Sequence, residues 1–300
     1  LSQGMRTGRS DATAALIAAG RFARWSIPIT LVALGALLVG GVLALLAGDG
    51  WLLLGDVANW LTHQASGRIT FVLDARWPRV LAAILAGGAL ALAGTLTQAV
   101  TRNALADPGL LGISAGAGVG ALVVIIGSSR AGLTLPTSAV TLGALAGALL
   151  AGGLLFTLAA RGGFNPTRLV LVGLGIAAGA AALSTLLVVS TDPWNQSRAI
   201  TWLGGSTYGT MAESLPPVAI LLALVGVGVY AGRHELDLVQ LDADTPRLLG
   251  VRHGRVRGLA LLGAVLLAGA ATAAVGVIGF VGLVAPHLAR LLVGPEHRRM

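Results

Sequence analysis

The chain has 300 residues, of which 55% are hydrophobic and 11% are charged. A soluble globular protein has roughly 25% charged residues, so this composition excludes soluble enzymes, disordered proteins and nucleic-acid binders. It predicts a polytopic membrane protein. The net charge of +8 is then an indication of orientation in the bilayer.

Cysteine and lysine are both absent from the sequence. Without cysteine there is no disulfide or thiolate metal site, and the scattered histidines do not form a metal-binding motif either. Without lysine there is no P-loop for a nucleotide. We therefore expect no metal site and no nucleotide-binding P-loop in this chain.

Apolar stretches long enough to cross a bilayer, about 20 residues each, follow one another along the chain. They are expected at 27–47, 77–100, 110–126, 135–160, 169–190, 217–230, 259–274 and 275–293, with a short apolar piece at 200–205. This predicts an all-α membrane helix bundle with about eight crossings, folded as a single domain over 1–300.

The arginines fall unevenly between the two sides of these spans. With a cytoplasmic N-terminus, the arginines placed outside are Arg68, Arg76, Arg79, Arg130 and Arg198, and all the others lie inside. Positive residues prefer the cytoplasmic side, so we expect a multi-pass protein with its N-terminus in the cytoplasm.

The longest polar stretch, 233–257, lies on this cytoplasmic side. It is either a solvated loop or a set of short helices that dock on a partner. Its apolar residues recur at helical spacing, which favours docking.

Glycines recur four residues apart in several spans, a spacing that lets membrane helices approach closely. These glycines are Gly112, Gly116 and Gly120, and the pairs Gly143 with Gly147 and Gly175 with Gly179. Ser114 also completes a G-x-S-x-G pattern, but a hydrolase elbow needs a preceding strand, so helix packing is favoured.

Two segments of similar sequence, 79–94 and 257–272, would cross the membrane in opposite directions. Inverted repeats of this kind are typical of transporters. If both halves are alike, about two further helices are expected beyond residue 300.

Several longer stretches, in their order along the chain, resemble one known family, the FecCD-type permeases of iron-siderophore, haem and cobalamin ABC importers. The stretches begin with Arg76-Trp-Pro-Arg79, Ala91-Leu-Ala-Gly-Thr-Leu-Thr-Gln98 and Arg102-Asn-Ala-Leu-Ala-Asp-Pro-Gly-Leu-Leu-Gly112, and end with Gly279-Phe-Val-Gly-Leu-Val-Ala-Pro-His-Leu-Ala-Arg290 and Gly294-Pro-Glu-His-Arg-Arg299. The resemblance runs from Arg76 to the C-terminus.

This resemblance implies a permease subunit with about ten helices when complete, in the bacterial inner membrane. Its implied partners are a second permease, identical or different, two cytoplasmic ATPase subunits that carry ATP and magnesium, and an extracytoplasmic solute-binding protein. The resemblance therefore implies that this chain itself binds no cofactor and is not an enzyme. The expected cargo is a ferric siderophore or a related metal chelate such as haem or cobalamin.

The resemblance also implies roles for particular residues. Arg76 and Arg79 would dock the binding protein, although ordinary helix-end arginines are the alternative. The segment 241–250 looks like the coupling helix that contacts the ATPase, within the region 233–257. The coupling residues are Leu241, Arg247, Leu249 and Gly250.

Two cytoplasmic loops resemble the family's inner gate, whereas simple helix capping is the alternative reading. The gate residues are Asn103, Asp107, Pro108, Asn165 and Pro166. The intramembrane Thr97 and Gln98 either line the translocation path or bond to a neighbouring helix.

The competing function is a secondary transporter driven by an ion gradient. It would require ionisable residues at mid-membrane. The spans are nearly free of Asp and Glu, which favours the ABC importer.

Overall fold

The computed structural model describes residues 27–48, 50–161, 165–240 and 253–293, and every regular element in these ranges is helical. The first helix is Ile27–Leu46. It is followed by α2 (Leu54–Leu61), α3 (Gly67–Thr101), the short 3₁₀ helix η1 (Pro108–Leu111), α4 (Ile113–Arg130), α5 (Thr137–Ala160), α6 (Pro166–Val189), α7 (Pro193–Leu203), a second 3₁₀ turn η2 (Ala212–Ser214), α8 (Leu215–Ala231), α9 (Arg233–Gln240), α11 (His253–Val275) and α12 (Val281–Val293).

Seven of the described helices are long and apolar enough to cross a membrane. The structure differs from the expected eight crossings at the last one, 275–293. There α11 continues to Val275, residues 276–280 are not helical, and α12 has 13 residues. Such a helix is about 20 Å long, shorter than the hydrocarbon core. The break occurs at Gly276, whose φ of +76° is accessible to glycine at little cost.

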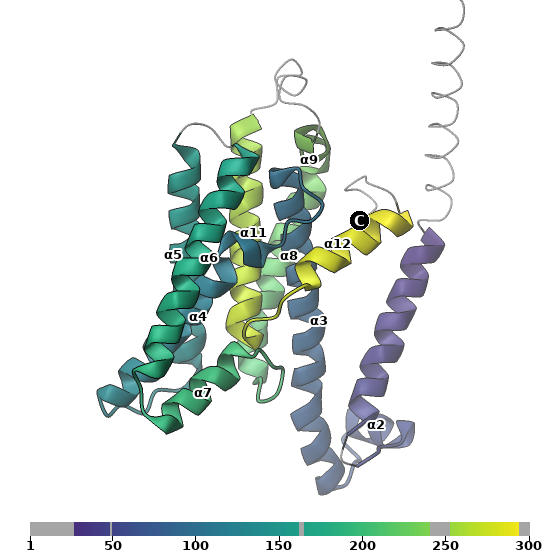
Figure 1. The fold of residues 1–300 in the computed structure, drawn as a ribbon. Helices are drawn as coiled ribbons and strands as arrows, with labels where there is room; N and C mark the ends of the chain where they lie inside the picture. The colour runs from purple at the N-terminus through teal and green to yellow at the C-terminus, as the bar shows by residue number, and fades with distance from the viewer. Residues whose placement is uncertain (1–26, 49, 162–164, 241–252, 294–300) are drawn as a thin grey trace, which may run out of the picture.

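Helices α3 and α11 form the centre of the bundle and run in opposite directions (Figure 1). Among the spans, α11 has the largest buried share, whereas Ile27–Leu46 buries none of its residues and stands at the edge. The two segments with similar sequences therefore pack against each other in antiparallel orientation.

The short helices α2 and α7 lie at one end of the bundle and α9 lies at the other, whereas α12 lies between the two ends (Figure 1). We call the end that carries α2 and α7 the α7 end, and the opposite end, where α9 lies, the α9 end. Arg68, Arg130 and Arg198 lie at the α7 end, on α3, α4 and α7 respectively. Arg161 follows the end of α5 and Arg233 begins α9, and both lie at the α9 end. Arg68, Arg130 and Arg198 thus share one end of the bundle, opposite to Arg161 and Arg233.

The glycine spacing on α4 and α5 serves close packing between the two helices. A Cβ at Gly120 would lie 2.0 Å from the Gly143 carbonyl oxygen, and one at Gly147 would lie 2.2 Å from that of Gly116. Any larger residue would push the helices apart. Gly175 and Gly179 differ, because a Cβ there would meet nothing within 4 Å.

Ser114 follows η1 at the start of α4 rather than a strand. Its buried hydroxyl accepts a hydrogen bond from the Thr272 hydroxyl on α11, with a distance of 3.3 Å between the oxygens. A hydrolase elbow requires the strand-to-helix turn, so this serine joins two helices instead.

Candidate functional site

Arg76 lies at the α7 end, where it binds the C-terminus of the first helix. Its guanidinium donates hydrogen bonds to the carbonyl oxygens of Leu45 at 2.9 Å, Leu46 at 3.2 Å and Gly50 at 3.0 Å. The last carbonyls of a helix have no partner within the helix and carry partial negative charge, so a cation is favourable there. A Cβ at Gly48 would lie 2.2 Å from the guanidinium, so glycine leaves the room that Arg76 occupies.

Arg79 stands one helical turn further along α3 and is half-buried. Its Cζ lies 4.3 Å from the ring centroid of Tyr208, in the segment between α7 and α8. This cation–π contact holds Tyr208, whose side chain is otherwise 79% exposed. The two arginines that sequence reasoning treated alike therefore have different neighbours.

The polar residues of the two predicted gate loops bond to their own backbones. The Asn103 Oδ1 accepts from the Leu105 N–H at 2.9 Å, and the Asn165 Oδ1 accepts from the Thr167 N–H at 3.0 Å. The Asp107 Oδ1 accepts from the Gly109 N–H at 2.6 Å. These are turn and capping geometries.

The 102–112 segment packs between α6 and α12. Pro108 is buried at the start of η1, and its Cδ lies 2.7 Å from the position that a Gly282 Cβ would take. On the other side, a Cβ at Gly173 of α6 would lie 2.8 Å from the Leu111 Cα. The segment therefore contacts α6 at Gly173, two turns beyond Asn165 and Pro166.

Asp107 also packs against the start of α12. A Cβ at Gly282, in the first turn of that helix, would lie 3.2 Å from the Asp107 Oδ2. Together with Pro108, this side chain places the loop after α3 in contact with α12.

Asp107 is expected to make stability depend on pH. Burial raises the pKa of its carboxyl above the usual range, and the hydrogen bonds from Gly109 and Leu283 offset this in part. Because the folded protein then holds this proton more tightly than the unfolded chain, stability falls as pH rises from the ordinary carboxyl pKa through the raised one.

Asp107→Asn keeps an acceptor oxygen but cannot ionise. We expect this variant to be more stable than the wild type at pH 7, with the difference shrinking as pH falls toward the ordinary carboxyl pKa. Thermal unfolding in detergent at a series of pH values measures this. Parallel curves for the two proteins would contradict it.

Gln98 joins α3 to α12 in the half of the bundle nearer the α9 end. It is 4% exposed, and its Nε2 donates to the Leu283 carbonyl oxygen at 3.4 Å, while its Oε1 accepts a hydrogen bond from Arg290. The structure thus places Gln98 between two helices. Thr97 beside it is fully buried, and its hydroxyl makes no hydrogen bond within the described residues.

The same two helices touch through glycines. A Cβ at Gly94 would lie 1.8 Å from the Gly282 carbonyl oxygen, and one at Gly282 would lie 3.2 Å from the Leu90 carbonyl oxygen. The backbones are therefore in direct contact one turn from Gln98.

The predicted coupling residues Leu241, Arg247, Leu249 and Gly250 lie outside the described residues. Sequence reasoning missed Arg290 and Gly282 as partners of α3. An arginine inside an apolar helix signals a specific partner, whereas no pattern identified the glycine contact.

The sequence is similar to those of known membrane transport proteins. A model of the FecCD transport family matches residues 36–300. The ferric enterobactin permease FepD of Escherichia coli (strain K12) is 40% identical over 236 residues, 78% of this chain and 69% of its own length. The hemin transport permease HmuU of Yersinia pestis is 39% identical over 244 residues, 80% of this chain and 72% of its own.

Among solved structures, an inward-facing putative metal-chelate type ABC transporter superposes with a TM-score of 0.77 at 25% identity. The match covers 93% of this chain and 83% of that one. The match to the family model covers most of the chain, and two relatives share about two fifths of the aligned residues. This multi-pass membrane chain therefore belongs to the FecCD transport family, as a permease subunit of an ABC importer.

Proposed function

We propose that this permease imports a ferric siderophore or a related metal chelate across the bacterial inner membrane. The observation that carries the proposal is the 40% identity to a ferric enterobactin permease across 78% of the chain. A hemin permease matches to a similar extent, so the proposed cargo class is metal chelates in general.

The proposal assigns ATP and magnesium to a separate ATPase and no cofactor to this chain. The ATPase would bind at the α9 end through the region 233–257, with Leu241, Arg247, Leu249 and Gly250 in the contact. A second permease subunit would complete the translocation path. This orientation places the arginine-rich α9 end, and the N-terminus, in the cytoplasm.

Transport itself needs no covalent chemistry in this chain, only two packings whose relative stability the ATPase changes. The proposed inner gate consists of Asn103, Asp107, Pro108, Asn165 and Pro166. Support comes from the close packing of Asp107 and Pro108 against Gly282 of α12, because a displacement of α12 would disturb this loop. Thr97 and Gln98 lie beside this connection and are proposed to border the path.

An ion-driven secondary transporter is the competing function. The seven described spans contain two acidic residues, Asp74 and Glu213, and both lie near the α7 end. A coupling carboxylate would be expected at mid-membrane. The described spans therefore favour the ATP-driven mechanism.

Uptake into liposomes tests the proposal. The permease, its ATPase and the binding protein are reconstituted, and ATP-dependent uptake of a radiolabelled ferric siderophore is measured. We expect uptake to stop with an ATPase variant that cannot hydrolyse ATP. Uptake that ignores ATP and follows a proton gradient would overturn the proposal.

The affinity of the binding protein for the same liposomes tests docking at Arg76 and Arg79. Arg79→Glu removes a cation from the α7 end, so we expect the binding protein to bind at least about tenfold more weakly at low salt. Thermal stability is expected to fall only slightly, because an exposed cation–π contact contributes about 0.5–1 kcal/mol. Arg76→Glu is expected to weaken docking too, but also to lower stability, because three carbonyl hydrogen bonds are lost. Arg68→Glu makes the same charge change at an exposed position of the same end. If Arg68→Glu and Arg79→Glu weakened binding of the binding protein equally, a specific docking site at Arg79 would be contradicted.

A further inference from the structure

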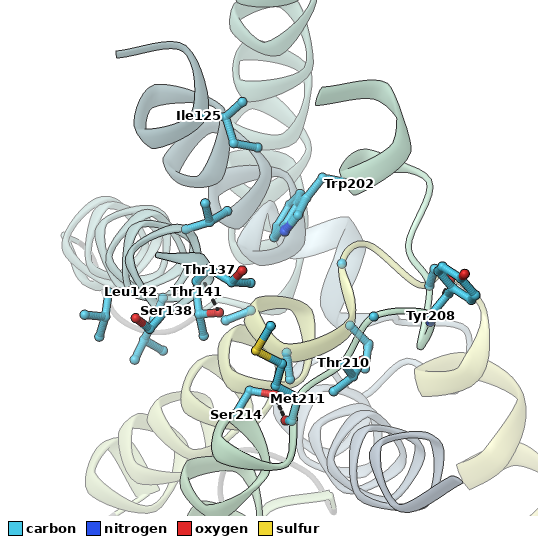
Figure 2. A pocket seen from close by; sticks show the side chains of 18 of the residues that line it. Ile125, Thr137, Ser138, Thr141, Leu142, Trp202, Tyr208, Thr210, Met211 and Ser214 are labelled. Carbon is cyan, nitrogen blue, oxygen red and sulfur yellow. Dashed lines mark hydrogen bonds between the residues drawn. The ribbon is translucent and has the colours of Figure 1, made fainter. Parts of the chain in front are cut away.

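A pocket of about 680 Å³ opens at the α7 end, between α4, α5, α7, α8 and α11. Figure 2 shows Trp202, Thr137 and Thr141, and Met211 and Ser214 arranged around one common space. Sites for small molecules commonly have volumes of about 300–1,000 Å³. None of the residues proposed for docking, the inner gate, the translocation path or ATPase coupling lines this pocket.

Small residues on α11 create the space. Ala270, Ala273 and Ala274 line the pocket at positions where larger side chains would fill part of it. The wall ends at Gly276, where a Cβ would lie 2.5 Å from the Trp202 carbonyl oxygen. The backbone of the α11–α12 break therefore supports the segment that carries Trp202.

The lining combines aromatic faces with hydroxyl groups. Trp194 is 81% exposed and Tyr208 is 79% exposed, so their rings are available to a ligand, and the Trp202 indole is half-buried. Arg198 and Glu213 are the charged residues of the lining, and Thr and Ser hydroxyls come from α5, α7 and the segment before α8. A purely apolar lipid chain would leave these polar groups unused.

The pocket is joined to the proposed docking end by one contact. Arg79 lies over the ring of Tyr208, and Tyr208 belongs to the pocket lining. A ligand released at Arg79 would therefore reach the aromatic wall directly. Arg198 and Glu213 give the lining one charge of each sign, and Arg79 adds a cation beside Tyr208. The Tyr208 side of the pocket therefore favours an anionic ligand.

We propose that this pocket is a reception site for an anionic metal chelate whose metal-binding groups are aromatic rings, as in iron(III) tris-catecholates. The inference rests on the proposed function and deepens it, because it selects one class among the metal chelates. Ring stacking on Trp202 and Tyr208 would recognise the ligand, and hydroxyl groups would bond to its oxygen atoms. A chelate whose metal ligands are hydroxamates has no rings to stack there.

Fluorescence of Trp202 tests the site directly. The permease, assembled with its ATPase in lipid nanodiscs without binding protein, is titrated with an iron(III) tris-catecholate. Quenching that the wild type shows and Trp202→Phe lacks comes from Trp202 and reports on the pocket. We expect this quenching to saturate as the tris-catecholate concentration rises. An iron(III) tris-hydroxamate should need an at least about tenfold higher concentration for half-maximal quenching.

Two matched variants separate the pocket from the rest of the membrane surface. Ala274→Phe places a ring inside the pocket, whereas Ala223→Phe adds the same ring at an exposed position of α8 outside the lining. We expect Ala274→Phe to raise the quenching midpoint by about tenfold or more, and Ala223→Phe to leave it unchanged. An unchanged midpoint in Ala274→Phe would overturn the inference.

A membrane lipid is the rival occupant of the pocket, and nanodiscs made from lipids with brominated acyl chains test for it. If brominated lipid quenches Trp202 and the tris-catecholate does not relieve that quenching, a lipid fills the pocket and the inference fails. ATP-driven uptake is measured on the same preparations. Uptake that continues while Trp202 shows no chelate binding would leave the proposed function standing and remove only the reception site.

Discussion

Replacing Gly94 by alanine is expected to separate α12 from α3 and to abolish uptake. The new Cβ would lie 1.8 Å from the Gly282 carbonyl oxygen, which is backbone and cannot rotate away. Overpacking of this kind costs about 1–3 kcal/mol, and we expect the upper end because the Cβ is fixed to one helix backbone and meets the backbone of another. The thermal midpoint in detergent and the initial rate of uptake measure the effect.

Gly87→Ala is the matched control for this experiment. It makes the same change on the same helix, where a Cβ would meet nothing within 4 Å. Alanine favours helix by about 0.8–1 kcal/mol over glycine, so this variant is expected to be as stable as the wild type or more so. If Gly94→Ala behaved like Gly87→Ala, close contact between α3 and α12 would be refuted.

Gln98→Leu is expected to produce the second large loss, through the polar connection between the same helices. The change removes the acceptor of Arg290 and the donor to the Leu283 carbonyl. A hydrogen bond to a charged group contributes about 1.5–3 kcal/mol, and the unpaired arginine remains partly buried. We expect reduced thermal stability and strongly reduced coupling of ATP hydrolysis to uptake.

Two further variants decide whether the connection itself matters. Gln98→Glu keeps an acceptor for Arg290 and adds an opposite charge, so it should retain most of the uptake that Gln98→Leu loses. Thr95→Val removes a hydroxyl that bonds only to the Ala91 carbonyl of its own helix, and it should have little effect. Equal uptake by Gln98→Leu and Thr95→Val would show that the Gln98 bonds to α12 contribute nothing.

The difference between the two docking arginines shows what sequence patterns leave open. Arg76 and Arg79 belong to one short motif and are three residues apart. Arg76 is held by carbonyls at the end of the first helix, and Arg79 by a ring from the segment between α7 and α8. Both partners come from elements distant in the sequence, so no local pattern could distinguish the two roles.

The gate loops show the opposite case. Asn103, Asp107 and Asn165 each bond to a backbone N–H two residues ahead. Such local bonds depend on residue type and short spacing, so capping was foreseeable from the sequence. The contact of Asp107 and Pro108 with Gly282 was not, because it requires α12 to return to the loop.

The sequence by itself determined that the chain is a helical membrane protein, where most of its spans lie, which ends of those spans carry arginine, and which family it resembles. These properties depend on composition and on the apolar run that a bilayer requires. Only the tertiary structure decided that the last expected crossing is interrupted at 276–280, that Gly94 meets Gly282, that Gln98 meets Arg290, and that small residues on α11 line a pocket. These features arise where helices far apart in the sequence approach one another, and such approach depends on packing between surfaces, which no single stretch of sequence contains.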